Sequence, residues 1–266
     1  MKLAFISPRW GGPLTALVLL SSPVLLQAAL ADRMATANAA LASGRANEAL
    51  ADYKEILASP ELAKSSSAEL WYNRGLAEEK KGESAASSLS FRRALLLDPG
   101  FTPARRQLVT VLEKIGVSAP LSWQEQLLGL VHPETMILVG AVAGWIGVMA
   151  LVVLLVGGPR RKGLIALAIF LAAAGHGCSA FGTMIDPRRT AGSKAVVISR
   201  TSPVLRATPA DSATSSGSLP PGTLITVLSR NGDWWYVASG SGLTGWIPSA
   251  TASSLLPSVA VSSRGS

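Results

Sequence analysis

The sequence is poor in the residues that most often carry out catalysis or bind metals. Among its 266 residues there is one cysteine, Cys178, and there are two histidines, His132 and His176. A single cysteine excludes a disulfide within the chain and a cysteine-rich zinc site. The sequence also lacks a nucleophile elbow, a phosphate-binding loop and a paired metal-ligand motif. We therefore expect no catalytic residues, no metal site and no cofactor, and we expect a protein that is not an enzyme.

Charged residues are scarce as well, at 15% of the chain, and their distribution is uneven. Between residues 32 and 118 the sequence holds 12 basic and 11 acidic side chains, so this stretch is nearly balanced. The basic surplus lies beside long apolar segments, at residues 160–162, Arg188 and Arg189. Membrane topology explains that placement better than a nucleic-acid surface does. We expect a membrane partner and no nucleic acid.

The N-terminus predicts a secretory signal peptide over residues 1–31. Lys2 and Arg9 supply the basic start, residues 13–26 supply the apolar centre, and Ala29-Leu30-Ala31 is a small–x–small cleavage site. A signal anchor that is never cleaved is the alternative. In both cases the chain that follows is exported.

Two uncharged runs predict transmembrane helices at residues 136–156 and 163–185. Only Gly157 to Lys162 separates them, and so short a linker joins antiparallel helices into a hairpin. The three cations of this linker favour a cytoplasmic loop, although Arg188, Arg189 and Lys194 count against that orientation. We expect a membrane protein whose soluble parts both face outward, away from the cytoplasm.

Within the hairpin, three glycines of the first span, Gly140, Gly144 and Gly147, could allow the helices to pack closely. His176 lies inside the second span. An ionisable residue there is a functional candidate. The alternative is an imidazole that reaches water or a neighbouring helix from the outer end of the span, and two residues, His176 and Cys178, do not make a metal site.

Residues 68–101 form a 34-residue unit. Small residues stand where two paired helices must approach closely, and large residues stand where the space between them must be filled. Gly82 permits a tight turn between two helices, and Asp98-Pro99 stops the second helix. The key positions are Trp71, Gly75, Gly82, Phe91, Ala94 and Pro99. The unit resembles a tetratricopeptide repeat. It departs from that pattern at Glu78, in the usual tyrosine position, and at Ser87, in the usual alanine position, which suggests a thinned core.

A weaker copy precedes this unit, and a single helix follows it. The copy places Ala37, Gly44, Ala49, Tyr53 and Ile56 at the corresponding offsets. Residues 102–115 form a half-unit whose apolar stripe is suited to a capping helix. Residues 32–118 are therefore predicted to be an all-α tetratricopeptide helical array. The resemblance implies a concave protein-binding groove lined by Glu69, Tyr72, Asn73, Leu76, Glu79 and Lys80, and the alternative is a solvated helix face.

Residues 194–256 predict an all-β domain. Five short β-rich runs, at 195–198, 203–205, 224–228, 234–237 and 244–248, are separated by turn-forming stretches. The order "PPGTLITVL…GDWWYV…GLTGWIP" resembles a bacterial SH3 domain, an SH3-like barrel, except for a long polar loop at residues 211–218. Residues 257–266 are predicted to be a disordered tail.

Adjacent residues of a strand face opposite sides, so either Trp234 or Trp235 must point outward. An exposed tryptophan could stack on a proline-rich or glycan ligand, or it could cover the edge of the barrel. The candidate SH3 groove consists of Trp234, Trp235, Tyr236, Trp246 and Pro248.

The order of these modules in a multidomain chain resembles the BatE-like proteins of the bacterial aerotolerance operon, with Leu70 to Gly75 close to that family's repeat. The resemblance implies a non-catalytic scaffold for protein–protein interactions linked to aerotolerance or envelope stress. It also implies that the scaffold is anchored in the bacterial inner membrane, with its soluble domains in the periplasm. Its implied partners are membrane proteins with von Willebrand factor A domains and a MoxR-type ATPase, the BatA/BatB/MoxR-type complex. The alternative is a peptidoglycan-binding module that recruits a wall-modifying enzyme.

Overall fold

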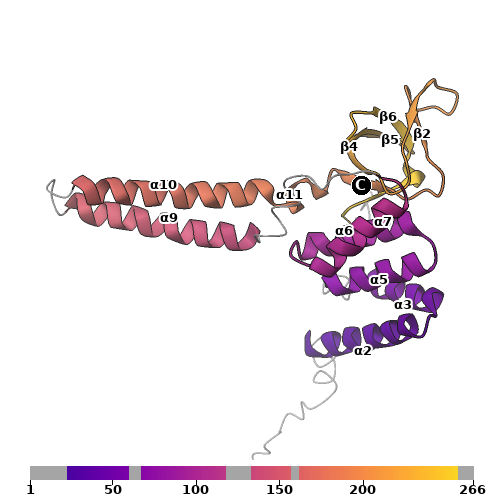
Figure 1. Ribbon diagram of the computed structural model, residues 1–266, viewed down its shortest axis with the longest axis horizontal. Helices are drawn as coiled ribbons and strands as arrows, with labels where there is room; N and C mark the ends of the chain where they lie inside the picture. The colour runs from indigo at the N-terminus through magenta and orange to yellow at the C-terminus, as the bar shows by residue number, and fades with distance from the viewer. Residues whose placement is uncertain (1–22, 60–66, 118–132, 157–161, 257–266) are drawn as a thin grey trace, which may run out of the picture. The chain divides into compact units, whose positions relative to one another are not determined.

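The computed structural model describes residues 23–59, 67–117, 133–156 and 162–256, which Figure 1 shows in colour. The chain divides into two compact units, residues 1–66 and 67–266. The first unit contains helices α2 (Pro23–Ala42) and α3 (Ala46–Ala58). Tyr53 and Ile56 of α3 are fully buried, and the Tyr53 hydroxyl lies 2.6 Å from Oδ1 of Asn38 on α2. The weaker copy of the repeat is therefore a helix pair, as predicted.

The predicted signal peptide lies partly outside the described residues. Its basic start and most of its apolar centre precede residue 23. The proposed cleavage site, residues 29–31, lies inside α2, where Leu30 is only 8% exposed.

The second unit begins with three helices, α5 (Ala68–Lys80), α6 (Ser84–Leu97) and α7 (Thr102–Lys114). The predicted unit of residues 68–101 corresponds to α5 and α6, and the predicted half-unit corresponds to α7. Gly82 joins α5 to α6 with φ +81°, a left-handed conformation that glycine adopts without strain. The helical array fits a tetratricopeptide-like arrangement.

Close packing of α5 on α6 depends on the absence of a side chain at Gly75. A Cβ atom there would lie 2.6 Å from Cε1 of Phe91, and Phe91 is fully buried. Trp71 and Ala94 are buried in the same layer. These are the positions for which the sequence pattern required large and small residues.

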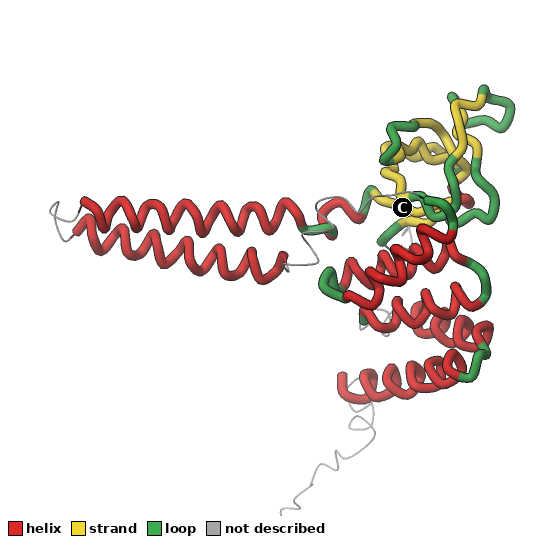
Figure 2. Tube along the Cα trace, viewed as in Figure 1, coloured by secondary structure: helices red, strands yellow, loops and turns green. Residues whose placement is uncertain are grey.

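Helices α9 (Pro133–Val156) and α10 (Lys162–Ile185) lie side by side as a hairpin, as Figures 1 and 2 show. Both are long and apolar enough to cross a membrane, and most of their surface is not covered by protein. Their bounds extend the predicted spans of residues 136–156 and 163–185 by a few residues. Residues 157–161, which belong to the predicted linker, lie outside the described residues.

Glycines form the contact between these two helices, which confirms the prediction for Gly140, Gly144 and Gly147. All three are buried, and a Cβ at any of them would lie 2.3–2.6 Å from an atom of α10. At Gly144 the nearest atom belongs to the ring of His176. Nδ1 of His176 lies 2.8 Å from the carbonyl oxygen of Ala172, one turn earlier in α10. His176 therefore packs against Gly144 of α9 while it remains exposed.

After α10 the chain forms the short helix α11 (Arg188–Ala191) and then a seven-stranded antiparallel sheet with the order β3-β2-β6-β5-β4-β1-β7. Figure 2 shows these strands in yellow. The strands are β1 (Lys194–Val197), β2 (Val204–Arg206), β3 (Ser215–Ser218), β4 (Leu224–Asn231), β5 (Trp234–Ser239), β6 (Thr244–Pro248) and β7 (Ala252–Ser254).

Five of these strands correspond to the five predicted runs, and two were not predicted. Strand β3 lies in the stretch 211–218, which the sequence indicated as a polar loop, and it pairs with β2. Serine and glycine have low β-propensity, so the sequence of β3 gives no strand signal. Strand β7 pairs with β1. The predicted tail of residues 257–266 lies outside the described residues.

Strand β1 is buried on both faces. Ala195 and Val197 belong to the core of the sheet domain, together with Leu205, Ile225 and Ile247 among others. Val196 points the other way and packs with Leu89 and Leu96 of α6, Ala191 of α11 and Leu255. The continuous apolar run Ala195 to Ile198 follows from this double burial.

Candidate binding surfaces

An aromatic patch occupies one face of strands β5 and β6. Residues that lie opposite each other in an antiparallel pair project to the same side of the sheet. Trp234 lies opposite Pro248, and Tyr236 lies opposite Trp246. The Tyr236 and Trp246 rings have centroids 5.3 Å apart and planes tilted by 47°. All four side chains are partly exposed, so the patch can offer aromatic surface to a ligand.

The fifth predicted groove residue, Trp235, lies on the opposite face of β5. It is paired with buried Ile247 and packs against the core of the sheet domain. The guanidinium of Arg230 lies 5.1 Å from the centroid of its ring. Strand alternation thus separates Trp235 from the other four residues, and Trp234 is the outward-facing member of the tryptophan pair.

Arg206 extends the aromatic patch with a positive charge. It lies opposite Trp246 on the neighbouring strand β2, so it shares the face of the patch. Its Nη1 donates to the carbonyl oxygen of Ala213, at 2.9 Å, in the polar loop. This contact ties the loop before β3 to the edge of the patch.

The six predicted groove residues of the repeat all lie on α5, but they differ in how exposed they are to solvent. Glu69 and Lys80 are exposed, and the other four are partly buried. Tyr72 packs edge-on against Phe101, with centroids 5.4 Å apart, and Glu79 lies 3.8 Å from Nζ of Lys114. The side chains that face α7 are therefore already engaged within the protein. The residues in the partly buried set are Tyr72, Asn73, Leu76 and Glu79.

Glu78 does not leave the repeat with a thinned core. Its carboxylate is buried and accepts hydrogen bonds from Nε of Arg74, at 2.9 Å, and from the Ser90 hydroxyl, at 2.6 Å. Two guanidinium groups lie close to the Trp71 ring, with Arg74 5.3 Å and Arg93 4.7 Å from its centroid. A charged cluster replaces the apolar contact that a tyrosine would make.

Arg93 connects this cluster to the sheet domain. Its Nε donates to the carbonyl oxygen of Leu255 at 3.1 Å, and its Nη2 donates to that of Ser254 at 2.7 Å. A longer contact of 3.4 Å reaches the Ser253 hydroxyl. Strand β7 is an edge strand, and unpaired edge carbonyls need a partner. Arg93 supplies it.

Arg93 remains charged although it is buried. Burial, and to a smaller extent the charge of the neighbouring Arg74, lower the pKa of Arg93 to about 10, while the Glu78 carboxylate acts in the opposite direction. A pKa of about 10 still leaves the guanidinium protonated at neutral pH. The three acceptors on the sheet domain therefore receive charge-assisted hydrogen bonds.

The sequence prediction did not include this interface between α6 and the sheet. One signal for it was available, because the run Ala195 to Ile198 does not alternate as a strand with one solvated face would. No comparable signal marks Arg93, since its acceptors lie about 160 positions further along the chain.

Comparison with known proteins agrees with the C-terminal fold. The family model for the bacterial SH3 domain matches residues 201–253. That range contains the whole aromatic patch, all of strands β2 to β6, and the first two residues of β7. The match suggests a protein-interaction or cell-wall-binding module. No curated protein and no solved structure matches the chain.

The described residues also bear on metal binding. Across residues 23–59, 67–117, 133–156 and 162–256, the structure contains no group of three His, Cys, Asp or Glu residues that could hold a metal ion. Cys178 is a free thiol in α10.

Proposed function

We propose that this protein is a non-catalytic, membrane-anchored scaffold that binds a partner protein through the aromatic patch of its SH3 region. The observation that carries the proposal is the patch itself: Trp234, Tyr236, Trp246 and Pro248 share one partly exposed face of a sheet. Aromatic side chains fixed on strands lose little conformational entropy on binding, and they stack readily on the rings of an extended, proline-containing segment.

The surface of α5 provides a second contact in this proposal. Glu69 and Lys80 are exposed there, and Asn73 and Leu76 are partly exposed between them. Two weak contacts on one membrane-tethered chain raise the effective concentration of each site, so neither needs to be tight. Membership of a complex with von Willebrand factor A-domain membrane proteins and a MoxR-type ATPase is a proposal that rests on the resemblance in module order.

Binding of cell-wall glycan or peptide is the second candidate function. The match to the bacterial SH3 domain supports it, and so does the patch, because sugar rings also stack on aromatic faces. In this case the repeat helices would recruit a wall-modifying enzyme.

Capture experiments with one pair of variants separate the two candidates. The test variant is Tyr236→Ala/Trp246→Ala, and Leu243→Ala is the control, since Leu243 is 39% exposed but lies outside the patch. Recovery of membrane proteins with the detergent-solubilised chain, lost in the test variant alone, supports the scaffold. Retention on purified sacculi, lost in the same variant, supports wall binding. If neither ligand responds to the double substitution, the patch is not the binding site.

The proposed location of both binding surfaces is the outer face of the inner membrane. Reporter fusions after Ala119 and after Ser266 test it. Both fusions should be active with a periplasmic reporter and inactive with a cytoplasmic one, since the hairpin returns the chain to the side on which it started. The opposite pattern would overturn the proposed location.

A further inference from the structure

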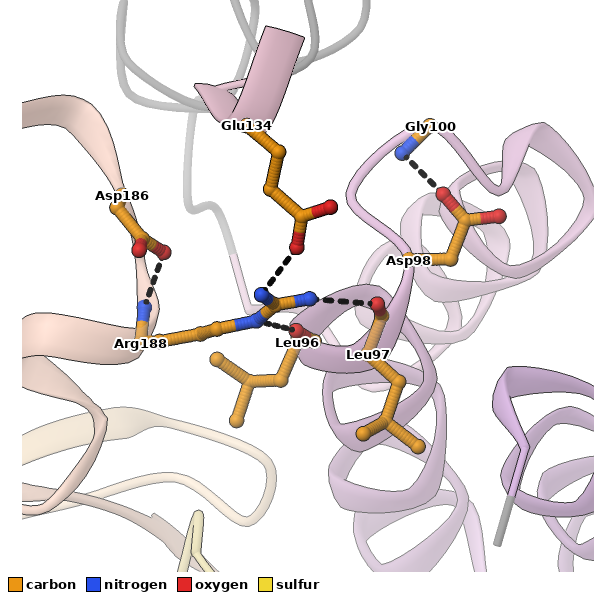
Figure 3. Close-up of polar contacts among 7 residues, drawn as sticks. All are labelled: Leu96, Leu97, Asp98, Gly100, Glu134, Asp186 and Arg188. Carbon is orange, nitrogen blue, oxygen red and sulfur yellow. Dashed lines mark hydrogen bonds and ion pairs between the residues drawn. The ribbon is translucent and has the colours of Figure 1, made fainter. Parts of the chain in front are cut away.

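Arg188 lies where the membrane hairpin, α11 and the repeat helices meet (Figure 3). Its backbone N–H donates to the Asp186 carboxylate at 3.0 Å. This contact forms a turn directly after α10 ends at Ile185, and it sets the direction in which the Arg188 side chain leaves the backbone.

The Arg188 guanidinium binds two other elements at once. Its Nε and Nη2 donate to the carbonyl oxygens of Leu96 and Leu97, each at 2.9 Å, in the last turn of α6. Its Nη1 pairs with the carboxylate of Glu134, in the first turn of α9. One side chain thus joins the end of the repeat helix to both arms of the hairpin.

The two carbonyl contacts are the stronger part of this junction. The last carbonyls of a helix have no intrahelical donor and carry the negative end of the helix dipole, so a cation is favoured there. A planar guanidinium can satisfy two adjacent carbonyls, which an ammonium group cannot do with fixed geometry. The pair with Glu134 is solvent-exposed and contributes little by itself.

An apolar contact supports the junction from one side. Ala191 of α11 is fully buried among Leu89 and Leu96 of α6, Val196 of β1 and Leu255. Helix α11 is therefore held to α6 by packing at one end and by Arg188 at the other.

We propose that Arg188 is a positioning residue that fixes the direction of the α9–α10 hairpin relative to the body formed by α5, α6, α7 and the SH3 region. The junction gives the protein a stalk of defined orientation in place of a flexible tether. The consequence is that the aromatic patch is held in one orientation relative to the hairpin, whichever ligand the patch binds.

The neighbouring residue Arg189 offers a matched control. It has the same charge and it is exposed, and within the part of the chain that the structure describes its side chain makes only a long contact of 3.5 Å to the Thr183 carbonyl oxygen. Arg188→Ala and Arg189→Ala thus both remove a positive charge beside the hairpin, but only Arg188→Ala removes the contacts of the junction.

Pulsed electron–electron double resonance, which measures the distance between two spin labels, tests the proposal on the full chain in detergent. In a Cys178→Ser background, one spin label is placed at Met149→Cys on α9 and the other at Ala250→Cys in the SH3 region, both exposed positions. A second pair, Glu113→Cys with Ala250→Cys, reports on the soluble body alone. Each pair is measured in the parent, in Arg188→Ala and in Arg189→Ala.

The expected result is a narrow distance distribution for both pairs in the parent and in Arg189→Ala. In Arg188→Ala the hairpin-to-body distribution should broaden about twofold or more, while the distribution within the body stays narrow. An unchanged hairpin-to-body distribution in Arg188→Ala overturns the proposal, and so does a broad one in the parent. Broadening of both pairs also overturns it, because Arg188 would then stabilise the body and not its orientation.

Discussion

The guanidinium of Arg93 lies 4.7 Å from the centroid of the Trp71 ring and at the same time donates a 2.7 Å hydrogen bond to the carbonyl oxygen of Ser254. Trp71 belongs to α5, Arg93 to α6 and Ser254 to β7, so a single side chain joins a helix pair to the edge of a sheet. The repeat helices and the SH3 region are therefore joined by specific contacts, in addition to the chain that connects them.

Arg93→Ala should destabilise this interface by about 2–4 kcal/mol. The substitution removes the Arg93 donors from one buried and one partly buried carbonyl, and it removes a cation from the Trp71 ring. Chemical denaturation of the full chain in detergent, followed by tryptophan fluorescence, measures the loss. Arg106→Ala on the exposed side of α7 is the control and should change stability by less than about 0.5 kcal/mol. Equal effects of both substitutions would contradict the role assigned to Arg93.

Gly75→Ala should destabilise the α5–α6 pair by about 1–3 kcal/mol, because the new methyl group would overlap the ring of Phe91. The cost should fall when Phe91 is shortened, so that Gly75→Ala and Phe91→Leu are less than additive in the double variant. Thermal unfolding of the four proteins, followed by circular dichroism, provides the comparison. Strict additivity would mean that the two positions do not share the same space.

The elements set by local patterns could be predicted from the sequence. Trp71, Gly75 and Phe91 occupy positions whose size requirements repeat along the chain, and the helices they predicted are present. The alternation in Trp234-Trp235 likewise required one ring to face outward, although only the register with β6 identifies Trp234 as that ring.

The elements that depend on distant partners could not be predicted. Strand β3 consists of serine and glycine, and it exists because β2 offers it a ladder of hydrogen bonds. In the sequence, nothing distinguishes Arg93 and Arg188 from surface arginines, since most of their acceptors are backbone carbonyls of distant segments. A backbone acceptor leaves no mark in residue type, so such contacts require the structure.

The first unit should lose stability at high pH, because the phenol of Tyr53 is buried. Burial, and to a smaller extent the charge of Asp52, raise the pKa of Tyr53 to about 12, above its ordinary value of 10.0. The unfolded chain therefore loses this proton first. The contribution of Tyr53 is complete below about pH 10 and is lost as the pH rises to about 12, at up to about 1.4 kcal/mol per pH unit.

Tyr53→Phe isolates this effect. At neutral pH the variant should be less stable by about 1 kcal/mol, because the hydrogen bond to Asn38 is lost. Between pH 10 and 12 the difference from the parent should shrink, since the variant has no phenol to ionise. Urea denaturation at a series of pH values measures the difference, and the subtraction cancels the titration of the lysines. A difference that does not vary with pH would rule out the raised pKa.

The hairpin offers a pair of glycines on one helix that should respond in opposite ways to the same change. A Cβ at Gly175 would lie 2.3 Å from the backbone nitrogen of Gly144 on α9, whereas a Cβ at Gly177 would meet nothing within 4 Å. Gly175→Ala must therefore separate the two helices, at a cost of about 1–3 kcal/mol. Gly177→Ala should be neutral or slightly stabilising, because alanine is the better helix former. The measurement is a titration of the detergent-solubilised protein with sodium dodecyl sulfate, followed by circular dichroism. The midpoint of unfolding should fall for Gly175→Ala alone. If the two variants unfold at the same midpoint, glycine packing does not hold the hairpin together, and other contacts between α9 and α10 must do so.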